Sequence, residues 1–260
     1  MKRQSFQKFL FLLCLGGILF LSVQSSTADK PLISEQTYLY KTTFVRAAPG
    51  KLLELIDLLK ERMAWYDSVG DERPFWWRHT QGDQWDLMMI YPMESYTEYY
   101  SKTRVKRRNK SQSGALSPEE IQAKFHECVS WYEDLFVMGP PLDIVEDVFK
   151  DTSFYHCEIF IALPGKRAEL FRQREMENAY LREIGRTQNL IFTRDQGASW
   201  DLFTLGCYRD MDQWAVSTGV SAAKKEESAV KAGFTGADHI GPYMRTLILL
   251  HRDTIGVAIK

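Results

Sequence analysis

The chain has 260 residues, of which 45% are hydrophobic, 26% are charged and 13% are aromatic, and its formal net charge is −1. This composition excludes disorder over most of the chain, because disordered segments lack the apolar surface that offsets chain entropy. The balanced charge also disfavours a general nucleic-acid binder, and the length fits one large domain or two domains of about 130 residues.

Residues 1–28 have the pattern of a secretory signal peptide. Three cations and no acid accompany an apolar run from residue 9 to residue 23, and the small residues Ser26 and Ala28 then occupy positions −3 and −1. We expect cleavage before Asp29 and an exported, periplasmic or extracellular protein without stable membrane insertion. Loss of the three cations takes the net charge from −1 to −4. The alternative is an uncleaved anchor, although a spanning helix needs about 20 apolar residues.

Three cysteines follow this segment, namely Cys128, Cys157 and Cys207. An odd number allows at most one disulfide, so the chain is not a disulfide scaffold. The sequence contains no CxxC pair or Cys/His cluster with metal-ligand spacing. It therefore predicts no metal site and three buried thiols that act as small apolar side chains.

An internal repeat organises the chain. Residues 40–99 align with residues 155–214 at a constant offset of 115, without a gap and with fourteen identities. Both copies contain Pro-Gly-Lys and, later, Gln-Gly-x-x-Trp-Asp-Leu. A period above 100 residues predicts two domains rather than a solenoid, and we place them at 36–145 and 152–254.

The first copy alternates between strand and helix patterns. In chain order we expect a strand over 38–47, a helix from 52 to near 70, strands over 75–80 and 85–91, a helix over 118–134 and a strand over 135–138. Pro49-Gly50 separates the first strand from its helix, and Ser117 caps the second helix. The basic run over 102–110 is expected to be a solvated loop.

The second copy repeats this order. We expect a strand over 154–162, a helix with Leu170, Phe171 and Leu181 on its apolar face, strands over 190–194 and 200–208, a helix over 222–232, a turn near 238–244 and a strand over 247–250. In the first helix of this copy, Arg174 and Asn178 replace Leu59 and Met63 of the first copy.

Each copy therefore reads as β-α-β-β-α-β, the ferredoxin-like split βαβ unit. Its sheet carries helices on one face only, so the other face must be buried elsewhere. Two units in one chain bury these faces against each other. The sequence thus predicts an α+β protein in which two ferredoxin-like modules form a pseudo-dimeric α+β barrel.

The chain resembles the dimeric α+β-barrel superfamily, which includes NIPSNAP-like and antibiotic-biosynthesis-monooxygenase-like proteins. The resemblance rests on a first strand that runs into Pro-Gly-Lys and a helix, and on a third strand with a tryptophan, Trp85 or Trp200. It covers about residues 36–252 and implies the fold. Because the superfamily includes oxygenases, haem enzymes, isomerases and binding modules, it does not fix the activity.

Among the shared residues, Trp85 and Trp200 are expected in the core. Asp86 and Asp201 are expected to cap the turn after Gln-Gly, with a buried acid as the alternative. The closing strand of the second copy is followed by His251-x-Asp253, to which we assign a polar rim.

Two polar residues of the second copy are candidate catalytic groups. Along 154–162, His156 and Glu158 share one face of the strand, about 7 Å apart by the strand rise. A histidine beside a carboxylate suits a general base with an orienting partner. Lys41 and Thr43 stand there in the first copy, so the fold does not require the pair. The alternative is a satisfied polar pair at the barrel rim.

A tryptophan-rich strand of the first copy is the candidate ligand-binding element. Trp76, Arg78 and His79 lie within four residues, whereas the second copy has smaller apolar side chains in place of the tryptophans. Indole faces with a cation suit a flat apolar molecule that bears an anionic group. The alternative is that these large side chains only fill the core of the first half.

Some haem-degrading monooxygenases of the superfamily use an asparagine on strand one, a tryptophan on strand three and a histidine on helix two. The chain has no asparagine on either first strand, which breaks that pattern. His126 and His239 fall in the regions of the second helices, so the resemblance leaves them as candidate haem ligands.

The sequence thus favours an exported small-molecule-binding barrel with an apolar, aromatic-lined pocket for an apolar or aromatic ligand, and with oxygenase-like or isomerase-like activity as an option. The alternatives are a non-catalytic structural or interaction module and a haem-binding enzyme. No nucleic-acid partner is expected, and further homo-oligomerisation stays open. Hydrolase, nucleotide and calcium motifs are absent from the sequence.

Overall fold

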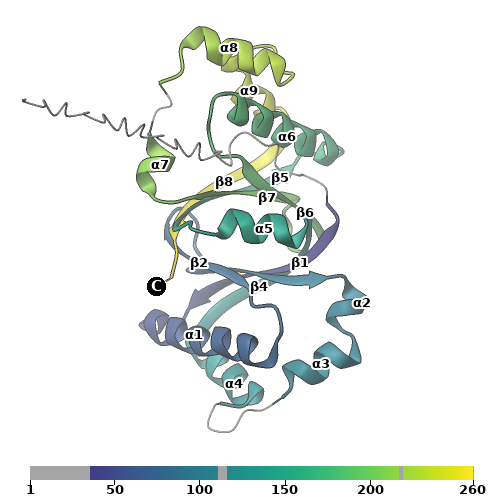
Figure 1. The fold of residues 1–260 in the computed structure, drawn as a ribbon, viewed down its shortest axis with the longest axis vertical. Helices are drawn as coiled ribbons and strands as arrows, with labels where there is room; N and C mark the ends of the chain where they lie inside the picture. Colours follow the sequence, from purple (N-terminus) through teal and green to yellow (C-terminus); the bar gives the residue numbers. More distant parts are fainter. Residues whose placement is uncertain (1–35, 111–115, 217–218, 260) are drawn as a thin grey trace, which may run out of the picture.

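The computed structural model describes residues 36–110, 116–216 and 219–259. Its strands are β1 (Tyr38–Ala47), β2 (Phe75–Gln81), β3 (Leu87–Glu94), β4 (Val129–Gly139), β5 (Phe154–Ala162), β6 (Asn189–Gly197), β7 (Leu202–Tyr208) and β8 (Ile248–Val257). They close into an antiparallel barrel in the order β1-β3-β2-β8-β5-β7-β6-β4 (Figure 1). The predicted signal peptide lies outside the described residues. Within them, no helix has both the length and the apolar character needed to cross a membrane.

The helices surround and connect the strands. They are α1 (Leu52–Val69), α2 (Tyr96–Tyr99), α3 (Lys102–Arg108), α4 (Pro118–Cys128), α5 (Leu142–Phe149), α6 (Arg167–Glu183), α7 (Met211–Ala215), α8 (Ala222–Lys231) and α9 (Ile240–Arg245). Local sequence sets several ends. Gly70 ends α1 in the left-handed conformation, and Ser117 with Glu120 forms a capping box at the start of α4.

The barrel consists of two halves with the same strand order. Module 1, from β1 to β4, has the order β4-β1-β3-β2, and module 2, from β5 to β8, has the order β8-β5-β7-β6. This is the arrangement of the ferredoxin-like unit, so the predicted fold class is confirmed. The modules join at two antiparallel seams, β2 with β8 and β4 with β6. Closure leaves the barrel without an unpaired sheet edge.

The two inner sheet faces form one apolar core, as the open faces of the predicted modules require. Module 1 contributes Tyr40, Phe44, Trp77 and other residues, and module 2 contributes Phe192, Phe203 and others. Figure 1 shows α5, the helix that connects the modules, between the two sheets, and its Val145 is fully buried in this core. Separate apolar clusters form on the outer faces, under α1 and α4 in module 1 and under α6 and α9 in module 2.

The shared tryptophans and aspartates are structural. Trp85 is buried in the inner core, and both Trp85 and Trp200 contact the ring of Phe44. Each aspartate joins the third strand to the first. Asp86 accepts a hydrogen bond from the backbone N–H of Ala47 at 2.8 Å, and Asp201 accepts the equivalent bond from Ala162 at 2.8 Å. The expected turn-capping role is therefore wrong, because the carboxylates face the first strand of their module.

Several predicted element boundaries are wrong. The helix expected over 118–134 ends at Cys128, and β4 begins at once, because Val129 and the following residues alternate in burial as a strand does. The closing strand expected over 247–250 extends to Val257. The basic run is the helix α3 rather than a loop, and its Arg104 is buried in an ion pair with Asp71 at 2.7 Å.

Candidate functional site

A group of polar side chains lies between the outer sheet face of module 2 and α6. Its members come from four elements: His156 and Glu158 from β5, Thr204 from β7, His251 and Asp253 from β8, and Arg174 from α6. We call these six residues the module 2 polar cluster. β8, β5 and β7 are neighbours in the sheet, and strand alternation directs these side chains to the face that α6 covers.

Glu158 is at the centre of this cluster. Its Oε2 accepts a hydrogen bond from the Thr204 hydroxyl at 2.9 Å and lies 3.5 Å from Arg174 Nη1. Its Oε1 lies 3.3 Å from His251 Nε2. The same imidazole nitrogen is 3.3 Å from Asp253 Oδ1, and His156 Nε2 is 3.4 Å from that oxygen. Two imidazoles and two carboxylates thus form a chain of contacts across β5 and β8.

The helix side of the cluster is enclosed. The side chain of Arg174 is 3% exposed, and its guanidinium pairs with Glu177 as well as with Glu158. The guanidinium lies 5.0 Å from the centre of the Phe160 ring, and the His251 ring stacks on Phe160 at 4.7 Å with an interplanar angle of 15°. These contacts fix the orientation of Arg174 and of the imidazole.

The contacts shift the pKa values of the cluster in opposite directions. Hydrogen bonds to Asp253 and Glu158 raise the pKa of His251 to about 9. Hydrogen bonds from His156 and His251 lower the pKa of Asp253. Burial raises the pKa of Glu158, but the hydrogen bond from His251 and the charge of Arg174 outweigh it, so the net shift is downward. The cluster therefore favours a positive charge between two carboxylates.

Module 1 provides an internal comparison. Asp134 pairs with Thr43 in the same register in which Asp253 pairs with Glu158. In module 1 the aspartate is satisfied by the Lys41 ammonium at 3.4 Å and by the Thr43 hydroxyl at 2.5 Å. Module 2 thus keeps the aspartate but replaces the lysine and the threonine.

The helices differ in the same way. Leu59 and Met63 of α1 are buried in an apolar cluster, whereas α6 has Arg174 and Asn178 at the equivalent positions. Asn178 is satisfied by the backbone N–H and carbonyl of Asn189, at 2.8 Å each. Of the two substitutions, only Arg174 adds a charge to the cluster.

The structure places His156 and Glu158 on one face of β5, as the sequence predicts, but gives each a different partner. His156 contacts Asp253, and Glu158 contacts His251. Their role as an acid–base pair stays a prediction. Sequence reasoning missed His251 and Asp253, although the His-x-Asp pattern was visible, because the closing strand was predicted to end before them.

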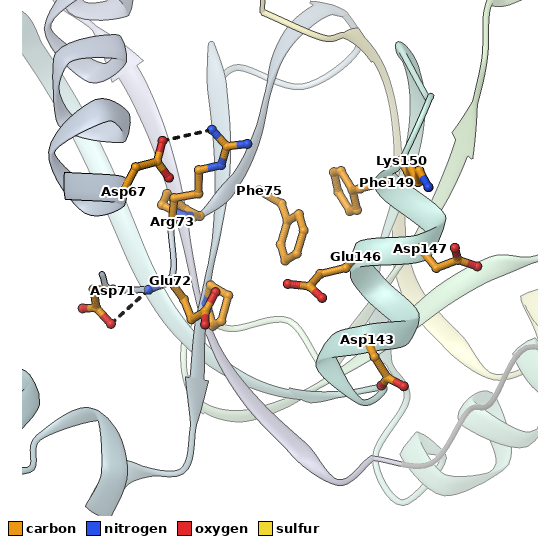
Figure 2. A pocket seen from close by; sticks show the side chains of 12 residues that line it. Asp67, Asp71, Glu72, Arg73, Phe75, Asp143, Glu146, Asp147, Phe149 and Lys150 are labelled. Carbon is orange, nitrogen blue, oxygen red and sulfur yellow. Dashed lines mark hydrogen bonds and ion pairs between the residues drawn. The ribbon is translucent and has the colours of Figure 1, made fainter. Parts of the chain in front are cut away.

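Two adjoining clefts lie at one end of the barrel, beside α5. The larger has a volume of about 630 Å³ and the smaller of about 350 Å³. Both are lined by Arg73, Pro74, Phe75 and Phe149. Figure 2 shows Phe75 of β2 and Phe149 of α5 facing each other, and their ring centres are 4.7 Å apart. The clefts therefore share an aromatic wall.

Acidic side chains dominate the larger cleft. Its lining carboxylates are Asp67, Asp71, Glu72, Asp143, Glu146 and Asp147, and its lining cations are Arg73 and Lys150. Asp71 forms an ion pair with the buried Arg104, and Asp67 lies 3.5 Å from Arg73. In Figure 2 the Glu146 carboxylate points toward Phe75. The smaller cleft is lined by Trp76, Met63 and Ile259 together with Lys60.

The predicted ligand-binding residues of β2 do not form one pocket. Trp76 lines the smaller cleft and packs on the outer side of module 1. The side chain of His79 alternates to the inner face, where its ring lies 5.6 Å from Trp85. The His79 Nε2 atom is buried without a hydrogen-bond partner among the described residues, and burial lowers the pKa of this histidine. Arg78 lies between them on the outer face, so the set is divided between two sides of the sheet.

The candidate haem ligands lie on exposed helical surfaces. His126 on α4 contacts Gln122 at 2.8 Å, and His239 before α9 contacts Asp238 at 2.8 Å. Both histidines are exposed, and neither lines one of the two clefts. The arrangement of these side chains does not support the haem hypothesis.

Comparison with known proteins gives a likeness of fold. No family model matches the chain, and no curated protein matches its sequence. An anthrone oxidase-like protein superposes with a TM-score of 0.54 at 10% identity, over 88% of this chain and 94% of that chain. Candidate monooxygenases from Lactobacillus acidophilus and Fusobacterium nucleatum each give 0.51, at 5% and 11% identity, over 85% and 86% of this chain and 96% and 93% of theirs. At these identities the likeness shows the fold alone, which is the ferredoxin-like dimeric α+β barrel.

Proposed function

We propose that the chain binds a small, flat aromatic molecule with hydroxyl or ammonium groups in the two adjoining clefts beside α5. The observation that carries this proposal is the shared aromatic wall of Phe75 and Phe149, with Trp76 in the smaller cleft. Aromatic rings provide a large apolar contact area for a planar ligand, and pockets of several hundred Å³ suit small molecules.

The charges of the larger cleft determine the polar groups of this ligand. Glu72, Glu146 and Asp147 form no ion pair with another residue that the structure describes, so they can accept hydrogen bonds and attract cations. The sequence suggested an anionic group anchored by Arg78. Such a group is disfavoured in the clefts, because Arg78 lines neither of them and Arg73 already lies 3.5 Å from Asp67. Phenolic hydroxyl groups or a protonated amine fit better.

An oxygenase-like or isomerase-like reaction on this ligand is the finer part of the proposal. The names of the structural neighbours, an anthrone oxidase-like protein and two candidate monooxygenases, support the oxygenase-like option, and the isomerase-like option comes from the sequence resemblance alone. The likeness to NIPSNAP-like proteins stays a prediction. The alternative is a binding or interaction module without chemistry.

Three naphthalene probes of similar size and different charge test the binding site: 1-naphthol, 1-naphthylmethylammonium and 1-naphthoate. Quenching of tryptophan fluorescence measures the affinity of each probe. Naphthol and naphthylmethylammonium should bind more tightly than naphthoate, and naphthoate should bind at least about tenfold more weakly because its carboxylate is repelled by the acidic lining of the cleft. Native mass spectrometry of the purified chain would show whether a molecule co-purifies, and would also give the oligomeric state.

A charge reversal in the cleft provides the matched variant. Glu146→Lys should weaken binding of the ammonium probe and strengthen binding of naphthoate, whereas Glu119→Lys, on the exposed first turn of α4, should change neither. Equal affinities of the wild type for all three probes, or equal effects of both substitutions, would contradict the proposal.

Export is proposed from the sequence pattern of residues 1–28 alone. Expression of the full chain in a bacterial host should give a periplasmic or secreted product that begins at Asp29 by N-terminal sequencing. A product that retains Met1 and sediments with membranes would instead support the uncleaved anchor.

A further inference from the structure

Three ligand atoms of the module 2 polar cluster lie close to one another. One donor atom each from Glu158, His251 and Asp253 lies within 4.8 Å of the other two. His251 Nε2 is 3.3 Å from both carboxylate oxygens, and His156 Nε2 is 3.4 Å from the Asp253 oxygen. Ligands bound at about 2.0–2.2 Å in a tetrahedral site are about 3.3–3.6 Å apart. The spacings from His251 to Glu158 and to Asp253 are therefore those of neighbouring ligands around one metal ion, whereas His156 contacts only Asp253.

The donor types restrict the metal. One imidazole and two carboxylates suit Zn²⁺, Mn²⁺ or Fe²⁺, whereas Mg²⁺ and Ca²⁺ prefer sites built from oxygen alone. The side chains of Glu158 and His251 are 14% and 18% exposed, and that of Asp253 is 57% exposed. The site is thus enclosed on the side of the sheet and open beside Asp253, where an ion can enter.

Groups behind the donors hold them in position. Thr204 donates a hydrogen bond to Glu158 Oε2, and Arg174 forms an ion pair with the same oxygen. The other carboxylate oxygen, Oε1, therefore faces His251. The ring of Phe160 stacks on the imidazole of His251. Such support behind the ligands is usual at metal sites, where it orients the carboxylate and the ring.

The charges of the cluster also fit a dication. Glu158, Asp253 and Glu177 carry three negative charges, and Arg174 carries one positive charge. Binding of the ion displaces the proton from His251, and two negative charges then remain to neutralise the dication. In module 1 the ammonium of Lys41 supplies the cation beside the equivalent Asp134, and module 2 has no lysine at that position.

We propose that module 2 binds one divalent transition-metal ion through Glu158, His251 and Asp253, while His156 contacts Asp253 from outside the ligand set. This replaces the role of His156 and Glu158 as a free acid–base pair. It does not rest on the proposed function, because neither cleft contains a residue of the module 2 polar cluster.

Calorimetric titration of the untagged full chain, freed of metal with a chelator, tests this site with ZnCl₂ and MnCl₂. We expect one equivalent of metal per chain and a higher unfolding temperature for the loaded protein. Asp253→Asn and His251→Gln should each weaken binding at least about tenfold, and Thr204→Val, which removes only the support of Glu158, by about tenfold. The visible absorption of the Co²⁺ form reports the coordination number independently of any activity.

The double variant His126→Ala/His239→Ala is the matched control, because both imidazoles are exposed and lie outside the cluster. It should bind metal as the wild type does. Circular dichroism must show that each variant is folded, and Asp253→Asn is suited to this since its side chain is largely exposed. The proposal is overturned if the folded wild type binds neither metal, if binding survives both Asp253→Asn and His251→Gln, or if binding is lost in the control.

Discussion

Gly256 of β8 shows how a single residue sets the packing at a seam. It pairs with His79 of β2, and a Cβ atom placed on it would lie 2.2 Å from the Trp77 ring and 2.5 Å from the Arg78 carbonyl. The absence of a side chain therefore allows the indole to pack directly against the backbone of β8. Trp77 is fully buried, so the ring has no space into which to move.

We expect Gly256→Ala to lower the free energy of unfolding by about 1–3 kcal/mol, because overpacking forces shifts of side chains and backbone. Gly241→Ala is the control, since a Cβ atom at this helical position meets nothing within 4 Å. Urea unfolding measures both. A Gly256→Ala protein as stable as the control would contradict the close packing of β8 on Trp77.

Buried tyrosines make stability depend on alkaline pH. Burial raises the pKa of Tyr155 and of Tyr208 from 10.0 to about 12. Above pH 10 the unfolded chain releases these protons while the folded chain retains them, so stability is complete below pH 10 and falls up to pH 12. The loss is at most about 1.4 kcal/mol per pH unit for each group. Unfolding in urea at pH 9, 10 and 11 should show this decline, and Tyr155→Phe should reduce its slope. An unchanged slope would mean that Tyr155 ionises in the folded protein.

The candidate site was only half visible in the sequence. Strand alternation placed His156 and Glu158 on one face, and Arg174 stood out as a charge at a position that is apolar in the first copy. What brings them together is the pairing of β5 with β8, a contact between residues about 100 positions apart that local patterns do not encode. His251 and Asp253 could have been included only with the full length of β8.

At the scale of elements, the repeated Asp86 and Asp201 join two strands of each module at the same point. Each carboxylate accepts a hydrogen bond from the backbone of the first strand, and Asp201 also pairs with Arg194 at 3.0 Å. The repeat of this contact explains why Trp-Asp-Leu is identical in both copies: the tryptophan packs into the core while the aspartate holds the strand end.

Asp86→Ala should destabilise the protein by about 1–3 kcal/mol, because the Ala47 N–H is left without its acceptor. Asp86→Asn keeps an oxygen acceptor and should cost less. Thermal unfolding of the two variants provides the measurement. If Asn and Ala are equally harmful, the carboxylate acts through its charge rather than through this hydrogen bond.

The element predictions succeeded where the pattern was long and local. β1, α1, β5 and α8 lie close to their predicted bounds, since each has a clear period and a clear stop. The helix over 118–134 failed because its last third is aromatic and β-branched, and its pairing with β1 and β6 decides its conformation. The sequence pattern did not reveal α5. The position of this helix depends on its packing in the apolar core that both modules form.

At the scale of the whole molecule, each module depends on the other to cover its inner face. The rings of Phe44 and Trp77 from module 1 lie in the same core as those of Phe192 and Phe203 from module 2. The two seams add backbone pairing between the modules. Neither half therefore has a complete core of its own.

We expect residues 29–150 alone to associate or aggregate and to bind the dye ANS, because their inner sheet face is uncovered. Mixing this fragment with residues 151–260 should restore a one-to-one complex that no longer binds the dye. Size-exclusion chromatography with dye fluorescence follows both events. A monomeric first fragment that excludes the dye would show that module 1 folds independently.

The seam between β2 and β8 also has a consequence for synthesis. Thr80 and Ile255 are joined by a hydrogen bond across 175 residues of chain, so β2 leaves the ribosome long before β8 does. Until then β2 has no partner on that side, and the inner face of module 1 stays exposed through most of translation. A nascent chain with this exposed apolar face is prone to aggregate, and a chaperone that covers the face until β8 is synthesised would prevent this.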